Sequence, residues 1–360
     1  MTIVVADHVP PAAGTTSPMA ASSRHRAVAA WLFACCILVF VMVIVGGVTR
    51  LTHSGLSITE WQPIVGTVPP LSANDWQIAF DKYRATPEYQ QINKGMALDE
   101  FKGIFWWEYV HRLLGRAIGL AFLIPFLWFL ARRQIPQGYG GRLAAIFVLG
   151  GLQGAMGWYM VKSGLVDDPR VSQFRLTAHL GLAIVIFAAM FWVALSLVDP
   201  RRMAMTNAAV RSARRWGIGI VALVFVQILS GGFVAGIRAG FAYNTFPLMN
   251  GQLIPPEIMM IEPWWRNFFY NMATVQFDHR VLAWLLAFAV PALWWKVVGN
   301  TSVPPLARGA AHLLLVMVAV QIALGILTLI HVVPLTLAAA HQAGAVLLLA
   351  AALNLAHKLR

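Results

Sequence analysis

Four histidines at matched positions give this sequence its clearest capacity for chemistry: His111, His179, His279 and His341. Each lies one or two helical turns inside the same-side end of a long hydrophobic segment. An ionisable side chain inside such a segment is energetically costly, and it usually marks a functional site. Four of them, in two pairs at one depth, predict two metal or haem sites.

Haem suits these ligands better than zinc or copper. Imidazole nitrogens from two facing helices can fill both axial positions of a haem iron. Zinc and copper sites usually need more ligands, and no cysteine or second histidine lies three or four residues from any of the four. The alternative for each single position is a buried histidine that satisfies a neighbouring polar group. No Cys-x-x-Cys-His motif occurs, which excludes covalent haem attachment.

The elements that position these histidines are hydrophobic spans. The chain is 59% hydrophobic and 11% charged, which is typical of a polytopic membrane protein. Each of eight stretches is near the ~20 residues that a bilayer requires. They run over 27–49, 104–131, 142–161, 174–198, 216–237, 273–298, 307–330 and 334–356. We therefore expect an all-α membrane protein with eight transmembrane helices.

The net charge of +13 is explained by membrane topology without a nucleic-acid partner. In an eight-span arrangement the basic residues gather on one side, among them Arg24, Arg132, Arg214, Lys296 and Lys358. The positive-inside rule makes that side cytoplasmic and places both termini there. Residues 1–26 precede the first span, and their richness in Ala, Pro, Ser and Thr predicts a disordered cytoplasmic tail.

The chain contains an internal repeat. Gly46-Gly47 ends the first span and Gly231-Gly232 ends the fifth, and Pro69-Pro70 in the loop after the first has its counterpart in Pro255-Pro256. Because each half has an even number of spans, both insert with one orientation and form a parallel repeat. We expect two pseudo-symmetric four-helix bundles, 27–198 and 216–360, joined by a cytoplasmic linker over 199–215. Bundle cores are where facing helices build cofactor sites.

The two halves differ beside the first histidine of each pair. Glu108 precedes His111 by three residues, whereas Gln276 precedes His279 by three. Positions three apart share a helix face, so Glu108 should lie toward the same site as His111. A desolvated glutamate there can act as an acid or base. The sequence thus predicts chemistry in the first half and electron transfer in the second, unless Glu108 only orients His111 or pairs with Arg112.

Three arginines lie near the paired histidines: Arg112, Arg175 and Arg280. Arginine forks match carboxylates, so these residues are candidates for contacts with haem propionates. The alternative for each is an interaction with lipid headgroups.

Several long motifs resemble the haem A synthase family. They read E-Y-V-H-R-L-L-G-R, G-G-V-T-R-L-T-H-S-G-L-S, W-Q-P-I-V-G-T-V-P-P-L and R-V-S-Q-F-R-L-T-A-H-L-G, and the similarity extends from about residue 27 to 357. Some members carry paired cysteines in the outer loops. This chain has only Cys35 and Cys36, inside the first span, so it resembles the cysteine-free subgroup of alphaproteobacteria and mitochondria.

The resemblance implies an oxidoreductase that converts the C8 methyl group of haem O into the formyl group of haem A for cytochrome oxidase. It implies that His111 and His179 flank the substrate haem, that His279 and His341 ligate a haem b, and that Glu108 takes part in the oxidation. The absence of an obvious mitochondrial presequence favours a bacterial inner membrane as the location. The expected partners are a haem O synthase, a protein or quinone redox partner, cytochrome oxidase assembly factors and membrane lipid.

Two other functions stay open at this point. A non-catalytic dihaem b electron-transfer subunit would use the same four histidines, and a haem exporter or chaperone would move haem without changing it. A prenyltransferase that makes haem O is disfavoured, because the loops carry no paired Asp-x-x-x-Asp set for a diphosphate-bound metal. The sequence also leaves open a homo-oligomer.

Overall fold

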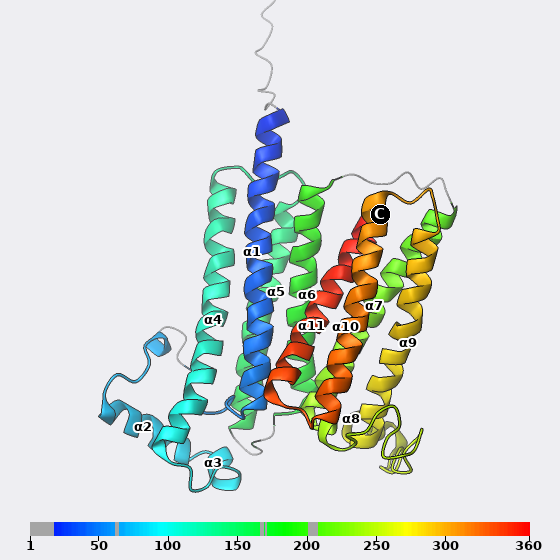
Figure 1. Cartoon of the computed structure of the whole chain (residues 1–360). Helices are drawn as coiled ribbons and strands as arrows, with labels where there is room; N and C mark the ends of the chain where they lie inside the picture. The colour runs from blue at the N-terminus through cyan, green and yellow to red at the C-terminus, as the bar shows by residue number, and fades with distance from the viewer. Residues whose placement is uncertain (1–17, 62–64, 166–168, 170, 201–207) are drawn as a thin grey trace, which may run out of the picture.

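Eight long helices standing side by side make up the body of the protein (Figure 1). The structure is a computed structural model that describes residues 18–61, 65–165, 169, 171–200 and 208–360. All eight helices are long and apolar enough to cross a membrane, which confirms the predicted all-helical class and number of spans. Their bounds are α1 Pro18–Leu51, α4 Leu98–Ala131, α5 Gly140–Gly164, α6 Gln173–Val198, α7 Ala208–Gly236, α9 Met272–Val298, α10 Pro305–Ile330 and α11 Leu335–Lys358.

Three helices, α1, α4 and α7, begin six to nine residues earlier than the hydrophobic stretches suggested. α1 begins at Pro18, so residues 18–26, assigned to the tail, are helical, while residues 1–17 lie outside the described part of the chain. α7 begins at Ala208, inside the expected linker, of which residues 201–207 are also outside the described part. Alanine and arginine make up six of the eight residues 208–215, and both residue types favour helix even where the segment is too polar to span.

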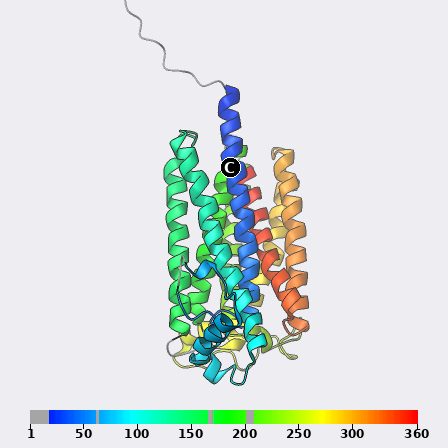
Figure 2. The same cartoon turned by 90° about the vertical axis from the view of Figure 1, so that its left-hand side faces the viewer.

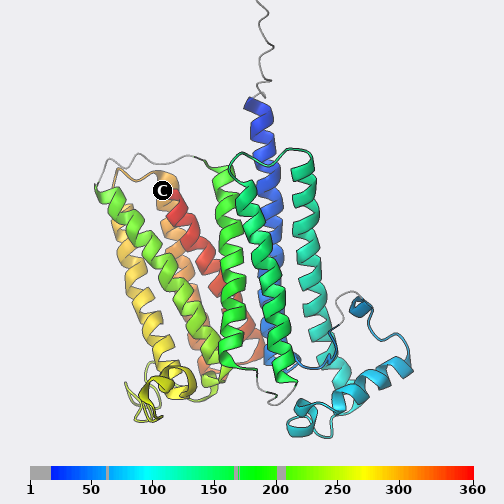
Figure 3. The same cartoon turned by 180° about the vertical axis from the view of Figure 1, so that it is seen from behind.

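The helices pack as two closed groups of four. In the first, α1 packs on α4, α4 on α5, α5 on α6 and α6 on α1, and in the second α7, α9, α10 and α11 follow the same cycle. The groups meet where α6 packs on α7 and where α11 packs on α1 and α6 (Figure 3). This packing is compatible with two bundles, and the division into two halves of one repeat stays a prediction.

The long loops and the short helices lie at one end of the block (Figures 1 and 2). The Pro18 end of α1 and the C-terminus lie at the other end, as an even number of spans requires (Figures 1 and 2). The short α-helices are α2 Ala73–Arg84, α3 Pro87–Gln91 and α8 Asn267–Tyr270, and the 3₁₀ turns are Val65–Thr67, Ala239–Phe241 and Trp264–Arg266.

The first long loop, hereafter the first loop, connects α1 to α4 and includes α2 and α3. Aromatic packing holds it against the first turns of α4. Ser72 caps α2 in a capping box with Asp75, which satisfies two backbone N–H groups at the start of that helix. Phe80 and Tyr83 of α2 then pack against Phe101 of α4, with ring centroids 5.2 and 5.1 Å apart. Such pairs stabilise beyond their buried area, so the loop is fixed beside the first turns of α4.

The first and last spans are tied directly to each other. The Nε2 atom of Gln342 in α11 donates a hydrogen bond to the carbonyl oxygen of Val43 in α1, 3.0 Å away. The same amide group fills the space beside Gly47, where any larger side chain would collide with it. The close approach of α1 and α11 therefore depends on a glycine in one helix and a polar side chain in the other.

Candidate functional site

The four predicted histidines occupy equivalent places on four helices. His111 lies in α4, His179 in α6, His279 in α9 and His341 in α11, each in the half of its helix nearer the loop end. All four are half-buried. Helices α4 and α6 belong to one packed group and α9 and α11 to the other, so each group carries two of the histidines. The use of each pair as haem ligands stays a prediction.

The second pair has a spacing that fits one iron. The ring centroids of His279 and His341 are 6.5 Å apart and the ring planes are nearly perpendicular, at 78°. Metal–imidazole bonds of about 2 Å on either side of one ion place the ring centres about 6 Å apart. Among the residues that the structure describes, no three His, Cys, Asp or Glu side chains gather into a metal-binding group. Two histidines alone suit haem better than zinc.

Every histidine ring lies against a glycine of the neighbouring helix. A Cβ atom placed on Gly46, Gly157, Gly231 or Gly325 would lie 3.1, 3.1, 3.3 or 2.9 Å from the ring of His111, His179, His279 or His341 respectively. Such contacts are tighter than side chains normally make, so an alanine at any of these positions would push against the histidine ring. We call each of these four glycines the glycine seat of its histidine. Gly46 and Gly231 stand out in the sequence as markers of the repeat, but their contacts with the histidine rings appear only in the folded protein.

Glu108 is buried and fully engaged. Its Oε2 atom accepts hydrogen bonds from the Ser57 hydroxyl at 2.7 Å and the Ile58 amide at 2.8 Å. Its Oε1 atom accepts from Nε and Nη2 of Arg112 at 3.0 and 2.6 Å. The pairing with Arg112, foreseen as an alternative, is therefore present. Ser57 was missed, because only the folded loop brings it to α4.

Arg112 donates hydrogen bonds to several groups of the protein. Besides Glu108, it donates to the carbonyl oxygens of Ile58 at 2.8 Å and Glu60 at 3.0 Å. These bonds attach the first loop to α4. A contact between Arg112 and a haem propionate stays a prediction, and it would compete with these bonds.

The equivalent place in the second group carries neutral chemistry. Gln276 donates through Nε2 to the Ala239 carbonyl oxygen at 2.8 Å, and its Oε1 accepts from Arg280 Nη2 at 3.2 Å. Arg280 also donates to the Tyr243 carbonyl oxygen at 3.0 Å, but its buried Nε has no hydrogen-bond partner. That unsatisfied donor suits a carboxylate such as a propionate. Arg175, the third candidate, stacks over Tyr159 at 4.7 Å.

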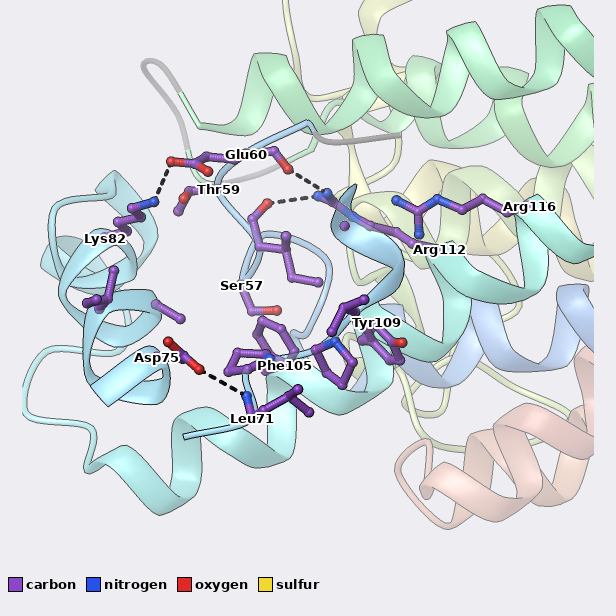
Figure 4. Close-up of a pocket in the computed structure, with 17 residues that line it drawn as sticks. Ser57, Thr59, Glu60, Leu71, Asp75, Lys82, Phe105, Tyr109, Arg112 and Arg116 are labelled. Atoms are coloured by element: carbon purple, nitrogen blue, oxygen red, sulfur yellow. Dashed lines mark hydrogen bonds and ion pairs between the residues drawn. The ribbon is translucent and has the colours of Figure 1, made fainter. Parts of the chain in front are cut away.

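A cavity of about 370 Å³ opens between the first loop, α2 and α4 (Figure 4). Ser57 and Arg112 line it, together with Glu60, Lys82 and Tyr109. Glu60 and Lys82 form an ion pair of 2.6 Å across its rim. Glu108 lies one hydrogen bond behind the wall, because its partners Ser57 and Arg112 face the cavity.

A second buried carboxyl group, Glu88 of α3, lies near Glu108. The hydroxyl of Tyr83 donates to Glu88 Oε2 at 3.3 Å and accepts from Asn93 Nδ2 at 2.7 Å. Burial and the charge of Glu108 raise the pKa of Glu88 to about 7, and the Tyr83 hydrogen bond and Arg50 oppose the rise. Glu88 was not predicted from the sequence, because its loop is polar and the burial of its side chain depends on tertiary packing.

Known proteins resemble this chain over nearly its whole length. The family model described as cytochrome oxidase assembly protein matches residues 29–353. A haem A synthase of Nitrosospira multiformis is 64% identical over 93% of this chain and 94% of its own length. The haem A synthases of Nitrosomonas eutropha and Parvibaculum lavamentivorans are 58% and 48% identical, each over 94% of this chain and 95% of their own. The chain therefore belongs to the cytochrome oxidase assembly protein family.

Proposed function

We propose that this protein is a haem A synthase, which oxidises the C8 methyl group of haem O to a formyl group and supplies haem A to cytochrome oxidase. Its relatives bear that name at up to 64% identity over nearly the whole chain. One structural observation supports the proposal most directly. Each group of four helices contains two histidines, and each of their rings packs against a glycine of a neighbouring helix.

The two pairs take different roles in this proposal. His111 and His179 hold the substrate haem, since only their group has a carboxylate, Glu108, three residues before the first histidine. His279 and His341 hold a haem b, and the neutral Gln276 stands where the first group has Glu108. The unsatisfied Nε of Arg280 supports a propionate contact in the second site. Haem b there supplies one-electron transfer when bound.

Glu108 is positioned to handle protons. Conversion of a methyl group to an aldehyde proceeds through two successive two-electron oxidations and loss of water from a geminal diol. If water supplies the oxygen, the redox partner takes up four electrons in all, and if dioxygen supplies it, the partner provides them. Protons must move at each oxidation. The bonds from Ser57 and Arg112 fix the carboxylate of Glu108 in one orientation. A positioned acid or base typically accelerates a step by about 10²- to 10⁴-fold. Isotope labelling of the aldehyde oxygen distinguishes water from dioxygen as its source.

The protein would work in the bacterial inner membrane with both termini in the cytoplasm. The end of the block that carries Arg24, Arg132 and Lys358 is then cytoplasmic, and the paired histidines lie toward the outer face. A haem O synthase would supply the substrate. A protein or quinone would exchange electrons with the second haem, and cytochrome oxidase assembly factors would receive haem A.

Co-expression with a source of haem O tests the proposal. The extracted haems are identified by mass, with Glu108→Gln protein as the matched control. We expect haem A from the unaltered chain and unchanged haem O from the variant. Unchanged haem O from the unaltered chain would refute the synthase. Two bound haem b and no reaction would favour a dihaem electron-transfer subunit, and haem transfer without a change in mass would favour an exporter or chaperone.

A further inference from the structure

Three of the four glycine seats are preceded by a glutamine one helical turn earlier. The resulting Gln–Gly segments are Gln153–Gly157 in α5, Gln227–Gly231 in α7 and Gln321–Gly325 in α10. Positions four apart lie on one helix face, so the glutamine and the glycine meet the same histidine.

Each of these glutamines donates a hydrogen bond to the main chain of its histidine, although the ring nitrogen that it approaches differs: Nε2 in His179, both in His279 and Nδ1 in His341. The Nε2 atoms of Gln153, Gln227 and Gln321 donate to the main-chain carbonyl oxygens of the histidines at 3.0, 3.1 and 2.9 Å. The same amide nitrogens lie 3.2–3.3 Å from a ring nitrogen of His179, His279 and His341. In all three glutamines the Oε1 atom is buried without a hydrogen-bond partner.

The fourth seat departs from this pattern. Met42 stands four residues before Gly46, where the other helices have glutamine, and its methyl group lies near Gly115. No hydrogen bond within the described part of the chain reaches the ring of His111. The ring also sits differently: Nε2 and Cδ2 of His111 face Gly46, whereas Cε1 of the other three histidines faces its glycine.

We propose that the Gln–Gly segments are positioning elements that fix three of the histidine rings, and that Met42 leaves His111 as the one ring able to turn away from a bound haem. Methionine offers no amide to a ring nitrogen or a carbonyl group, and its flexible side chain tolerates ring movement. His111 is also the histidine nearest in sequence to Glu108, three residues earlier in α4, so the ring would be released about one helical turn from the carboxylate.

The inference rests on the proposed function, in which the two haems have different fates. A substrate haem must enter and its product must leave in every cycle, whereas a cofactor haem stays. If His111 is a weakly held ligand of the substrate haem, haem O can enter and haem A can leave while the cofactor haem stays bound. The second pair, with glutamines on both His279 and His341, has no such ligand.

Carbon monoxide binding to the reduced, haem-loaded protein tests this difference, because carbon monoxide needs a vacated axial position. We expect the haem O held by His111 and His179 to bind carbon monoxide in the unaltered chain, and the haem b to resist it. Met42→Gln introduces an amide that can donate a hydrogen bond to His111, as the three glutamines do to their histidines. It should slow the binding of carbon monoxide about fivefold, the effect of one buried hydrogen bond. Met42→Leu, which has no amide, should bind as the unaltered chain does.

Loss of a glutamine should have the opposite effect in the second pair. Gln321→Met should make the haem b bind carbon monoxide, while Val320→Met, which adds a methionine beside an intact Gln321, should not. Equal rates for Met42→Gln and the unaltered chain would overturn the inference, as would a carbon-monoxide-inert haem b in Gln321→Met. If Gln321→Met loses its haem, Met42→Gln still decides, because it removes no hydrogen bond.

The two proposals fail separately. Haem A production with no difference between the Met42 variants removes the ring-release inference and leaves the synthase. If the variants bind carbon monoxide as expected but no haem A is formed, the proposal of a synthase fails. The inference that His111 is held less firmly than the other histidines then still stands.

Discussion

Replacing Glu88 with glutamine should stabilise the first loop, by an amount that depends on pH. The buried carboxyl group is surrounded by Tyr83 from α2, Glu108 from α4 and Arg50 from α1, and its pKa is raised from 4.5 to about 7. Each tenfold change in proton affinity corresponds to about 1.4 kcal/mol, so the ionised form costs the folded loop about 3 kcal/mol. Glutamine keeps an oxygen for the Tyr83 hydroxyl and carries no charge.

The sign of the pH dependence follows from the raised pKa of Glu88. Below pH 4.5 the carboxyl group is protonated in both folded and unfolded chains, so Glu88→Gln has little effect. Between pH 4.5 and about 7 the folded loop binds the proton more tightly, and its stability falls as the pH rises. Above pH 7 the full cost is present, and the variant should open its loop about a hundredfold less often, as converted from the same 3 kcal/mol.

Limited proteolysis of α2 and α3 in detergent-solubilised protein measures this opening. Cleavage reports the population of the open loop when opening is fast relative to cleavage. We expect slower cleavage of Glu88→Gln than of the unaltered chain at pH 8 and equal cleavage near pH 4. Glu262→Gln, at an exposed position in the second long loop, serves as the control. Faster cleavage of Glu88→Gln at pH 8 would refute the reasoning, since it would mean that the charge of Glu88 stabilises the loop.

Three further substitutions probe the site. Glu108→Gln should abolish haem A formation while both haems stay bound, measured by haem mass and absorbance, and wild-type turnover would remove Glu108 from the reaction. Gly325→Ala should lower haem b content, because its Cβ would lie 2.9 Å from the His341 ring, whereas Gly309→Ala in the same helix meets nothing within 4 Å and should retain haem b. Arg112→Lys should loosen the first loop by roughly 1.5–3 kcal/mol per lost charged hydrogen bond, visible as faster proteolysis, because lysine cannot reproduce the fork on Glu108.

Periodicity and hydrophobic length predicted the eight spans, because a bilayer requires each span to be long and apolar on its own. The histidine pairs were predictable for the same reason: an ionisable group in such a span stands out against its surroundings. Helix ends were less predictable. The first turns of α1 and α7 are polar, and local helix propensity rather than hydropathy decides where they begin.

The tertiary contacts of the site could not be predicted from the sequence. Glu108 was found as a difference between the repeats, but its partners Ser57 and Ile58 lie on a loop some fifty residues away, which has no periodic signal. The third Gln-x-x-x-Gly, at Gln227–Gly231, is visible in the sequence. Its meaning appears only when the ring of His279 is seen between the two residues.

The bond between Gln342 and Val43 has a consequence for biosynthesis. The two residues are 299 positions apart, and at about 5–20 residues per second the carbonyl group of Val43 waits roughly 15–60 s for its partner to be translated. During that time the face of α1 around Gly47 lies open to lipid or to a chaperone. A chain truncated before α11 should therefore leave its first span incompletely packed, and quality-control proteases could recognise it at the N-terminal end of the molecule, far in sequence from the deletion.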